Sequence, residues 1–267
     1  MIDGMYQVKR ISRSEFVPIR NHKYHVRVWG EAQPDVAPLM LMHGWMDVGA
    51  SFQFLVDALT DTFASGRQII APDWRGFGLT SAAPVDHYWF PDYLADLDFL
   101  LDHYAGERAV DLVGHSMGGN AVMQYAGARP QRIRRLINIE GFGVPRGRSS
   151  SAPKRYAYWM DELKALNRGE MKLKAYDSVE AVAQRLIKTN PRLGRDQAAR
   201  DRAQWLAHHW ASRTAAGQWE IQGDVAHKIR GATVSNLDEV LALYEAITAP
   251  TLFVDAAEDS LAGWYDG

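Results

Sequence analysis

The chain has 267 residues, and its 30 lysines and arginines against 32 aspartates and glutamates exclude the basic field that binds nucleic acids. Its lack of cysteine excludes disulfides, thiolate catalysis and cysteine-ligated metal centres. No apolar run approaches the ~20 residues that span a bilayer, and Met1 to Phe16 lacks a signal peptide's apolar stretch, so we expect a cytoplasmic protein without membrane or nucleic-acid partners.

Short apolar runs alternate with longer amphipathic stretches, which is typical of a mostly parallel α/β sheet flanked by crossover helices. Strands are predicted at Tyr24 to Trp29, Leu39 to Met42, Gln68 to Ala71, Val110 to Val113, Leu136 to Ile139 and Thr251 to Val254. Helices are predicted at Phe52 to Phe63 with Ser51 as its N-cap, Pro91 to Tyr104, Gly119 to Ala128 and Leu237 to Ile247.

The alternation stops after Gly143. From Pro145 to Ala232 the pattern is polar and helical, without a convincing buried strand, and the helical stretches are Arg155 to Asn167, Val179 to Lys188 and Gln197 to Ala211. We interpret residues 145–232 as a helical cap inserted into a core formed by residues 1–144 and 233–267. The alternative is that these helices belong to the outer layer of the core.

Residues Gly114 to Gly118 carry the spacing G-x-S-x-G of a nucleophile elbow around Ser116. A buried strand precedes the motif and a helix follows it, so the chain turns sharply at the serine. Such a turn strains the backbone of Ser116 and leaves little room for side chains two positions to either side. It also raises the hydroxyl above the sheet's carboxyl edge and directs a helix N-terminus at the negative charge that develops on a substrate.

Two further turns, His43-Gly44-Trp45 and the segment from Asp73 to Gly78, precede this motif in the order seen in α/β hydrolases, which the chain resembles over most of its length. The resemblance implies that the main-chain N–H groups of Trp45 and Met117 form an oxyanion hole. His43 is interpreted as structural. Asp73 and Arg75 are predicted to form an internal ion pair rather than to take part in catalysis.

The acid of a serine–histidine–acid triad has two candidates. Thr251 to Val254 resembles the family's seventh strand, and the family carries its carboxylate a few residues beyond that strand. This position matches Asp259. Glu140 ends another strand, where some haloalkane dehalogenases and their relatives carry the acid. We favour Asp259 over Glu140, with Asp255 as a third candidate. Either carboxylate would fix the tautomer of a histidine and stabilise its imidazolium form.

The histidine itself is missing from the expected place, because no histidine follows His227. His208 and His209 are adjacent on a predicted helix and are expected to face different directions, which argues against a shared metal site or a substitute base. We therefore favour a fragment whose last strand, helix and histidine are absent. The alternative is a complete, non-catalytic protein that binds a small ligand.

The leading hypothesis is a serine hydrolase that cleaves a carboxylic ester or similar small acyl substrate through an acyl-enzyme. A serine nucleophile argues against chemistry that uses an aspartate at this position. No metal or organic cofactor is implied, and the oligomeric state stays open. Aromatic residues of the predicted cap suggest an apolar acyl pocket, although packing explains them equally well: Tyr156, Tyr158, Trp159, Trp205, Trp210 and Trp219.

Overall fold

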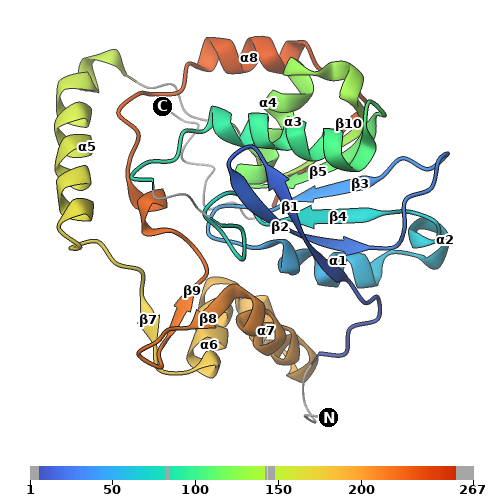
Figure 1. The fold of residues 1–267 in the computed structure, drawn as a ribbon, viewed down its shortest axis with the longest axis horizontal. Coiled ribbons are helices and arrows are strands. Elements are labelled where there is room, and N and C mark those ends of the chain that lie inside the picture. Colours follow the sequence, from blue (N-terminus) through green and yellow to red (C-terminus); the bar gives the residue numbers. More distant parts are fainter. Residues whose placement is uncertain (1–5, 82–84, 142, 144–147, 257–267) are drawn as a thin grey trace.

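The computed structural model describes residues 6–81, 85–141, 143 and 148–256, which contain one large sheet (Figure 1). Its seven strands lie in the order β1-β2-β4-β3-β5-β6-β10. They are β1 Arg13–Ile19, β2 His22–Trp29, β3 Leu39–Met42, β4 Ile69–Pro72, β5 Val110–His115, β6 Ile133–Ile139 and β10 Thr251–Val254. β2 is antiparallel to β1 and β4, and the other neighbouring strands are parallel. The predicted mostly parallel α/β sheet is confirmed.

Helices cover both faces of this sheet (Figure 1). One face carries α3 Pro91–Ala105, α4 Met117–Ala128 and α8 Leu237–Glu245. The other carries the 3-10 helix η1 Gly49–Phe52, α1 Gln53–Ala58 and α2 Asp61–Ala64. The sheet is thus the middle of three layers, which agrees with the strand and helix pattern of the sequence.

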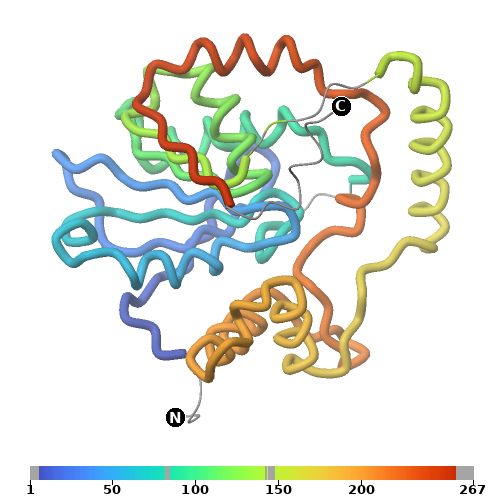
Figure 2. Tube along the Cα trace, turned by 180° about the vertical axis from the view of Figure 1, so that it is seen from behind, coloured from blue at the N-terminus to red at the C-terminus, as the bar shows by residue number. Residues whose placement is uncertain are grey.

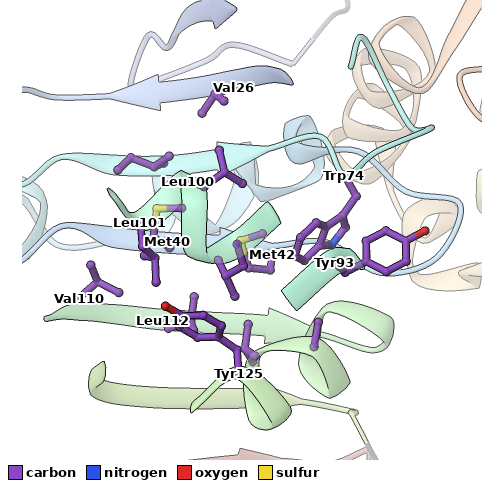
Figure 3. Packing of buried hydrophobic residues seen from close by; sticks show 14 of the residues in the cluster. Val26, Met40, Met42, Trp74, Tyr93, Leu100, Leu101, Val110, Leu112 and Tyr125 are labelled. Atoms are coloured by element: carbon purple, nitrogen blue, oxygen red, sulfur yellow. The ribbon is translucent and has the colours of Figure 1, made fainter. Parts of the chain in front are cut away.

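The alternation of side chains along the strands builds two cores. Val26 and Met40 face α3 and α4 and pack with Leu100 of α3 in the larger cluster, which Figure 3 shows. Leu41 points the opposite way and packs with Val56 of α1 in a smaller cluster. Because both faces are buried, the inner strands read as continuous apolar runs, which is why the sequence identified them.

Two features of the sheet domain differ from the prediction. β1 was not predicted, because only its last residues alternate clearly between buried and exposed positions. The single helix expected from Phe52 to Phe63 is divided into η1, α1 and α2, and Thr60 caps α2 by accepting from the Phe63 N–H. Ser51 lies within η1 and donates to Asp47 instead of capping a helix.

Residues 148–236, called the insert below, lie outside the seven-stranded sheet, as Figure 2 shows from behind. Its elements are η3 Ser149–Ser151, α5 Ala152–Asn167, β7 Ala175–Tyr176, α6 Val179–Thr189, η4 Pro191–Gly194, α7 Gln197–Trp210, β8 Ala211–Arg213, β9 Trp219–Ile221 and η5 Val225–Lys228. The insert was expected to offer no convincing buried strand, and the three short strands that form its second sheet, in the order β7-β9-β8, are mostly partly buried or exposed. They are too short for a periodic signal in the sequence.

The helices of the insert differ in how they pack. α6 and α7 share a buried cluster that also includes Val48 and Ala50 of the core. α5 stands apart from the sheet in both views and has no buried residue (Figures 1 and 2). Among the described residues, no helix is long and apolar enough to cross a membrane.

Candidate active site

Ser116 occupies the turn between β5 and α4. Its φ of 51° and ψ of −116° lie in a region that residues with a side chain rarely adopt. Two main-chain hydrogen bonds hold it there: its N–H donates to the Ile139 carbonyl at 2.8 Å, and the Asn120 N–H donates to the Ser116 carbonyl at 3.0 Å. The strained backbone predicted for Ser116 is therefore confirmed.

The glycines on either side of the serine let the turn close. A Cβ on Gly114 would lie 2.4 Å from the Gly118 carbonyl oxygen, and one on Gly118 would lie 2.3 Å from that of Met42. Both distances are far below van der Waals contact with backbone atoms that cannot move freely. A larger residue at Gly114 would push apart the two sides of the β5–α4 turn, and one at Gly118 would push this turn away from β3.

The turn after β3 lies directly against the serine. A Cβ on Gly44 would come within 3.2 Å of Ser116 Cβ, so the chain leading into Trp45 passes beside the hydroxyl-bearing residue. Met117 is the first residue of α4, where main-chain N–H groups have no acceptor within the helix. The two N–H groups implied for the oxyanion hole thus belong to the two turns that meet at Ser116.

His43 is fully buried beneath this turn. Its Nε2 accepts the Trp74 N–H at 2.8 Å, and its Nδ1 lies 2.8 Å from the Gly44 carbonyl oxygen, which requires the proton on Nδ1. Burial lowers the pKa of the imidazole and favours this neutral form. Because both ring nitrogens form hydrogen bonds, His43 joins the turn after β3 to the turn after β4, in agreement with the structural role expected of it.

The predicted ion pair between Asp73 and Arg75 is wrong. Asp73 Oδ2 instead accepts from His25 Nδ1 at 2.7 Å, and Oδ1 accepts the Gly49 N–H at 2.7 Å. Arg75 forms a two-pronged pair with the fully buried Asp96, with N···O distances of 2.6 Å for both Nε and Nη2. Both partners come from elements far away in the chain, which a two-residue spacing cannot reveal.

Of the proposed acids, Glu140 lies nearest the serine turn among the described residues. It directly follows β6 with a φ of 54°, and its N–H donates to the Val254 carbonyl at 2.9 Å. Its Oε2 is 3.7 Å from Nε2 of His115, the residue before Ser116. Asp255 is exposed after β10, and Asp259 lies outside the described residues. The sequence analysis did not single out His115, whose place in the motif is one of the variable positions.

No histidine that the structure describes forms a hydrogen bond with Ser116 Oγ. His227 is stacked between Phe77 and Tyr88, at centroid distances of 3.8 and 3.7 Å, and burial lowers its pKa to about 4. Within the described part of the chain there is also no group of three or more acidic or histidine side chains that fits a metal ion.

His208 and His209 contact different aromatic partners, Trp219 and Trp205 respectively, although both residues border one cavity. The aromatic residues of the insert also divide into two groups. Tyr156 and Tyr158 on α5 are largely exposed, whereas Trp205 is buried and Trp210 Nε1 donates to the Met46 carbonyl at 2.8 Å.

A mostly parallel sheet with a strained serine between a central strand and a helix defines the class of α/β hydrolases. The chain belongs to this family: the family model described as alpha/beta hydrolase fold matches residues 37–267. Relatives of the chain carry hydrolase names, which supports hydrolase function in this coarse sense.

Similar proteins span the family. A serine hydrolase-like protein of Danio rerio is 25% identical over 94% of this chain and 74% of its own length. A cis-3-alkyl-4-alkyloxetan-2-one decarboxylase of Shewanella oneidensis is 33% identical, but the match covers 54% of this chain and 43% of the relative. Among solved structures, a hypothetical protein of Pseudomonas aeruginosa PAO1 has a TM-score of 0.79 at 24% identity, covering 94% of this chain and 82% of that one. A thioesterase domain from the curacin biosynthetic pathway has a TM-score of 0.77 at 23% identity, with coverages of 94% and 85%.

Proposed function

We propose that the protein is a serine hydrolase that cleaves a carboxylic ester or a similar small acyl substrate through an acyl-enzyme. The observation that carries this proposal is the strained Ser116 between β5 and α4, with Gly44 packed against it. Strain of this kind costs of order 1–3 kcal/mol and persists where function requires a particular geometry. A merely structural serine would gain nothing from it.

In the proposed reaction, Ser116 Oγ attacks the acyl carbon while a histidine takes its proton. The main-chain N–H groups of Trp45 and Met117 then stabilise the oxyanion, and the loss of one such donor typically costs about 2.7–4 kcal/mol of transition-state stabilisation. Asp259 is our first candidate for the acid that orients the histidine, and Glu140 is the second.

The base of the proposed reaction is not among the side chains that bond to Ser116, because no described histidine forms a hydrogen bond with its hydroxyl. β10 is paired only on its β6 side among the described strands, and Leu252, Phe253 and Val254 are 41–56% exposed. Parallel strands are normally covered on both faces, so such apolar exposure favours a further covering element.

We also propose that residues 145–232 form a cap over the reacting groups. Trp210 contacts the turn that follows the proposed oxyanion donor, and the N–H of Gly78 donates to the Gln222 carbonyl at 2.8 Å. These contacts from the insert to the turn after β3 and to the turn after β4 support this arrangement. Small-molecule substrates would then enter beside Trp45, whose side chain is 51% exposed.

A fluorophosphonate probe tests the proposed nucleophile in the protein expressed from its whole reading frame. We expect covalent labelling that disappears in Ser116→Ala and persists in the control Ser212→Ala, which changes an exposed serine on β8. A folded protein that takes up no label would support the competing function, a small-ligand binder without hydrolase activity. The coding DNA past the Gly267 codon shows whether a strand and a histidine follow.

Paired substitutions separate the two candidate acids. Asp259→Asn is expected to lower the labelling rate by about 10³–10⁴-fold, because the histidine loses the carboxylate that fixes its tautomer. Glu140→Gln should change the rate little. The opposite ranking would assign the acid to Glu140, and equal small effects would remove both carboxylates from the mechanism.

A further inference from the structure

A cavity of about 260 Å³ lies between the sheet domain and the end of α7. Residues of β2, of η1 and of the turn after β4 border it from one side, and His208 and His209 border it from the other. Its lining includes neither Ser116 nor the proposed oxyanion residues. The cavity is therefore separate from the candidate active site.

Arg27 is the basic group of this cavity. Its Nη1 donates to Ser12 Oγ at 2.9 Å, and its Nη2 lies 3.4 Å from His209 Nδ1. Nε is buried without a hydrogen-bond partner, and no described carboxylate comes within ion-pair distance of the guanidinium. Largely buried cations are usually paired, so the charge of Arg27 is available to an anion.

His209 adds a neutral donor beside this cation. Burial and the neighbouring charge of Arg27 together lower its pKa to about 4, so the imidazole is uncharged at neutral pH. Since Nδ1 faces an N–H of Arg27, it accepts, and the proton resides on Nε2. The cavity thus combines one cation with one neutral N–H donor.

Asp73 also borders the cavity, and its negative charge disfavours a bound anion. Its oxygens, however, already accept hydrogen bonds from the protein. Oδ1 accepts the Gly49 N–H at 2.7 Å, and Oδ2 accepts the Leu79 N–H at 2.9 Å together with His25 Nδ1 at 2.7 Å. A cationic ligand would find most of the lone pairs of this carboxylate occupied. The Arg27 guanidinium, by contrast, keeps an N–H group that has no hydrogen-bond partner among the described residues.

The aliphatic part of the lining is formed by Val48, Ala50 and Leu79, and the polar side chains of His25, His208 and Gln222 complete it. A ligand that complements both the Arg27 guanidinium and the aliphatic part of the lining carries a negative charge at one end and a short apolar chain at the other. We propose that this cavity binds a short aliphatic carboxylate, with its carboxylate on Arg27 and the N–H of His209 and its chain against Val48, Ala50 and Leu79. Guanidinium groups suit this head group because they bind carboxylates in a two-pronged geometry.

Amide chemical shifts in a titration of the Ser116→Ala protein test this proposal without any contribution from hydrolysis. The probes are butyrate, butyramide and butylammonium at pH 7 and matched ionic strength. Butyrate is expected to shift the amides of β2 and α7 in a saturable manner, and the other two probes are not. Propionate should bind about fourfold more weakly than butyrate, because each buried methylene contributes about 0.8 kcal/mol.

Three variants complete the test. Arg27→Gln should weaken butyrate binding at least tenfold, Arg27→Lys should retain part of it, and the control Arg108→Gln should leave it unchanged, since Arg108 lies outside the cavity and donates only to carbonyl groups. Unaltered amide shifts elsewhere would establish that each variant is folded. Stronger binding of butylammonium or butyramide, or undiminished butyrate binding by Arg27→Gln, would overturn the proposal.

Discussion

Ser116 has a conformational cost that its side chain does not offset in the folded state, because Oγ makes no hydrogen bond with any described residue. Replacing it with glycine removes the penalty, whereas alanine keeps the Cβ and the strain. We predict that Ser116→Gly is more stable than Ser116→Ala by about 1–2 kcal/mol in urea denaturation. Both variants should lose probe labelling. Equal stabilities would show that the turn is not strained.

The second prediction at this scale concerns His227, whose pKa is lowered to about 4 by burial between Phe77 and Tyr88. The unfolded chain binds the proton near pH 6.5 and the folded protein only near pH 4. Stability is therefore fully present above about pH 6.5 and decreases as the pH falls toward 4, by about 3 kcal/mol at most for this residue.

His227→Phe keeps the stacking and should flatten this part of the stability profile. Urea denaturation from pH 4.5 to 7.5 measures it, and the exposed His103→Phe is the matched control that should keep the wild-type slope. An unchanged slope in His227→Phe would assign the acid sensitivity to other groups.

At the scale of elements, the buried pair of Arg75 and Asp96 ties the turn after β4 to α3. Tyr24 Oη and Arg20 Nη1 also donate to this carboxylate, the latter at 3.1 Å. We predict that Asp96→Asn destabilises the fold by about 3–5 kcal/mol, because the buried guanidinium of Arg75 loses its buried counter-charge and keeps only the partly exposed Asp92, at 3.1 Å. The comparison variant Asp92→Asn removes a partly exposed partner of Arg20 and Arg75 but leaves the buried Asp96 in place, and it should cost about 1 kcal/mol or less. Similar midpoints in urea for both variants would contradict this account.

The same elements show what the sequence makes visible. Strands such as β3 and β5 were predicted because burial on both faces requires an unbroken apolar run, and the serine turn was predicted because only glycines fit beside it. β1 lies at the edge of the sheet with most of its positions partly or fully exposed, so its pattern was weak. The partners of Asp73 and Arg75 come from β2 and α3, and such long-range pairs leave no local signal.

At the scale of the whole molecule, the insert is bonded to the core at several points, through Trp210 and through main-chain bonds on both sides of Gly223. We predict that α7 and β5 lose hydrogen-exchange protection in one cooperative step. α5 has no buried residue, so its amides should exchange earlier.

Trp210→Phe should lower the shared stability of α7 and β5 by about 1 kcal/mol, the usual value of one hydrogen bond. Trp159→Phe on the separate α5 is the control and should leave it unchanged. Different opening free energies for α7 and β5 in the wild-type protein would mean that the insert unfolds independently.

These main-chain bonds also restrict how the protein can admit a substrate. The Gln222 carbonyl accepts the Gly78 N–H, and the Asp224 N–H donates to the Gly76 carbonyl. The segment that follows β9 is thus joined to the turn after β4 at two points. A lid hinged at β9 would have to break both bonds or carry that turn with it, and the turn is itself anchored by Arg75 to α3. By contrast, α5 has no buried residue, and its hydrogen bonds to other described segments run within the insert, from Arg155 to the Ala232 carbonyl and from the Arg230 N–H to Glu162, so its displacement would leave the proposed oxyanion donors in place.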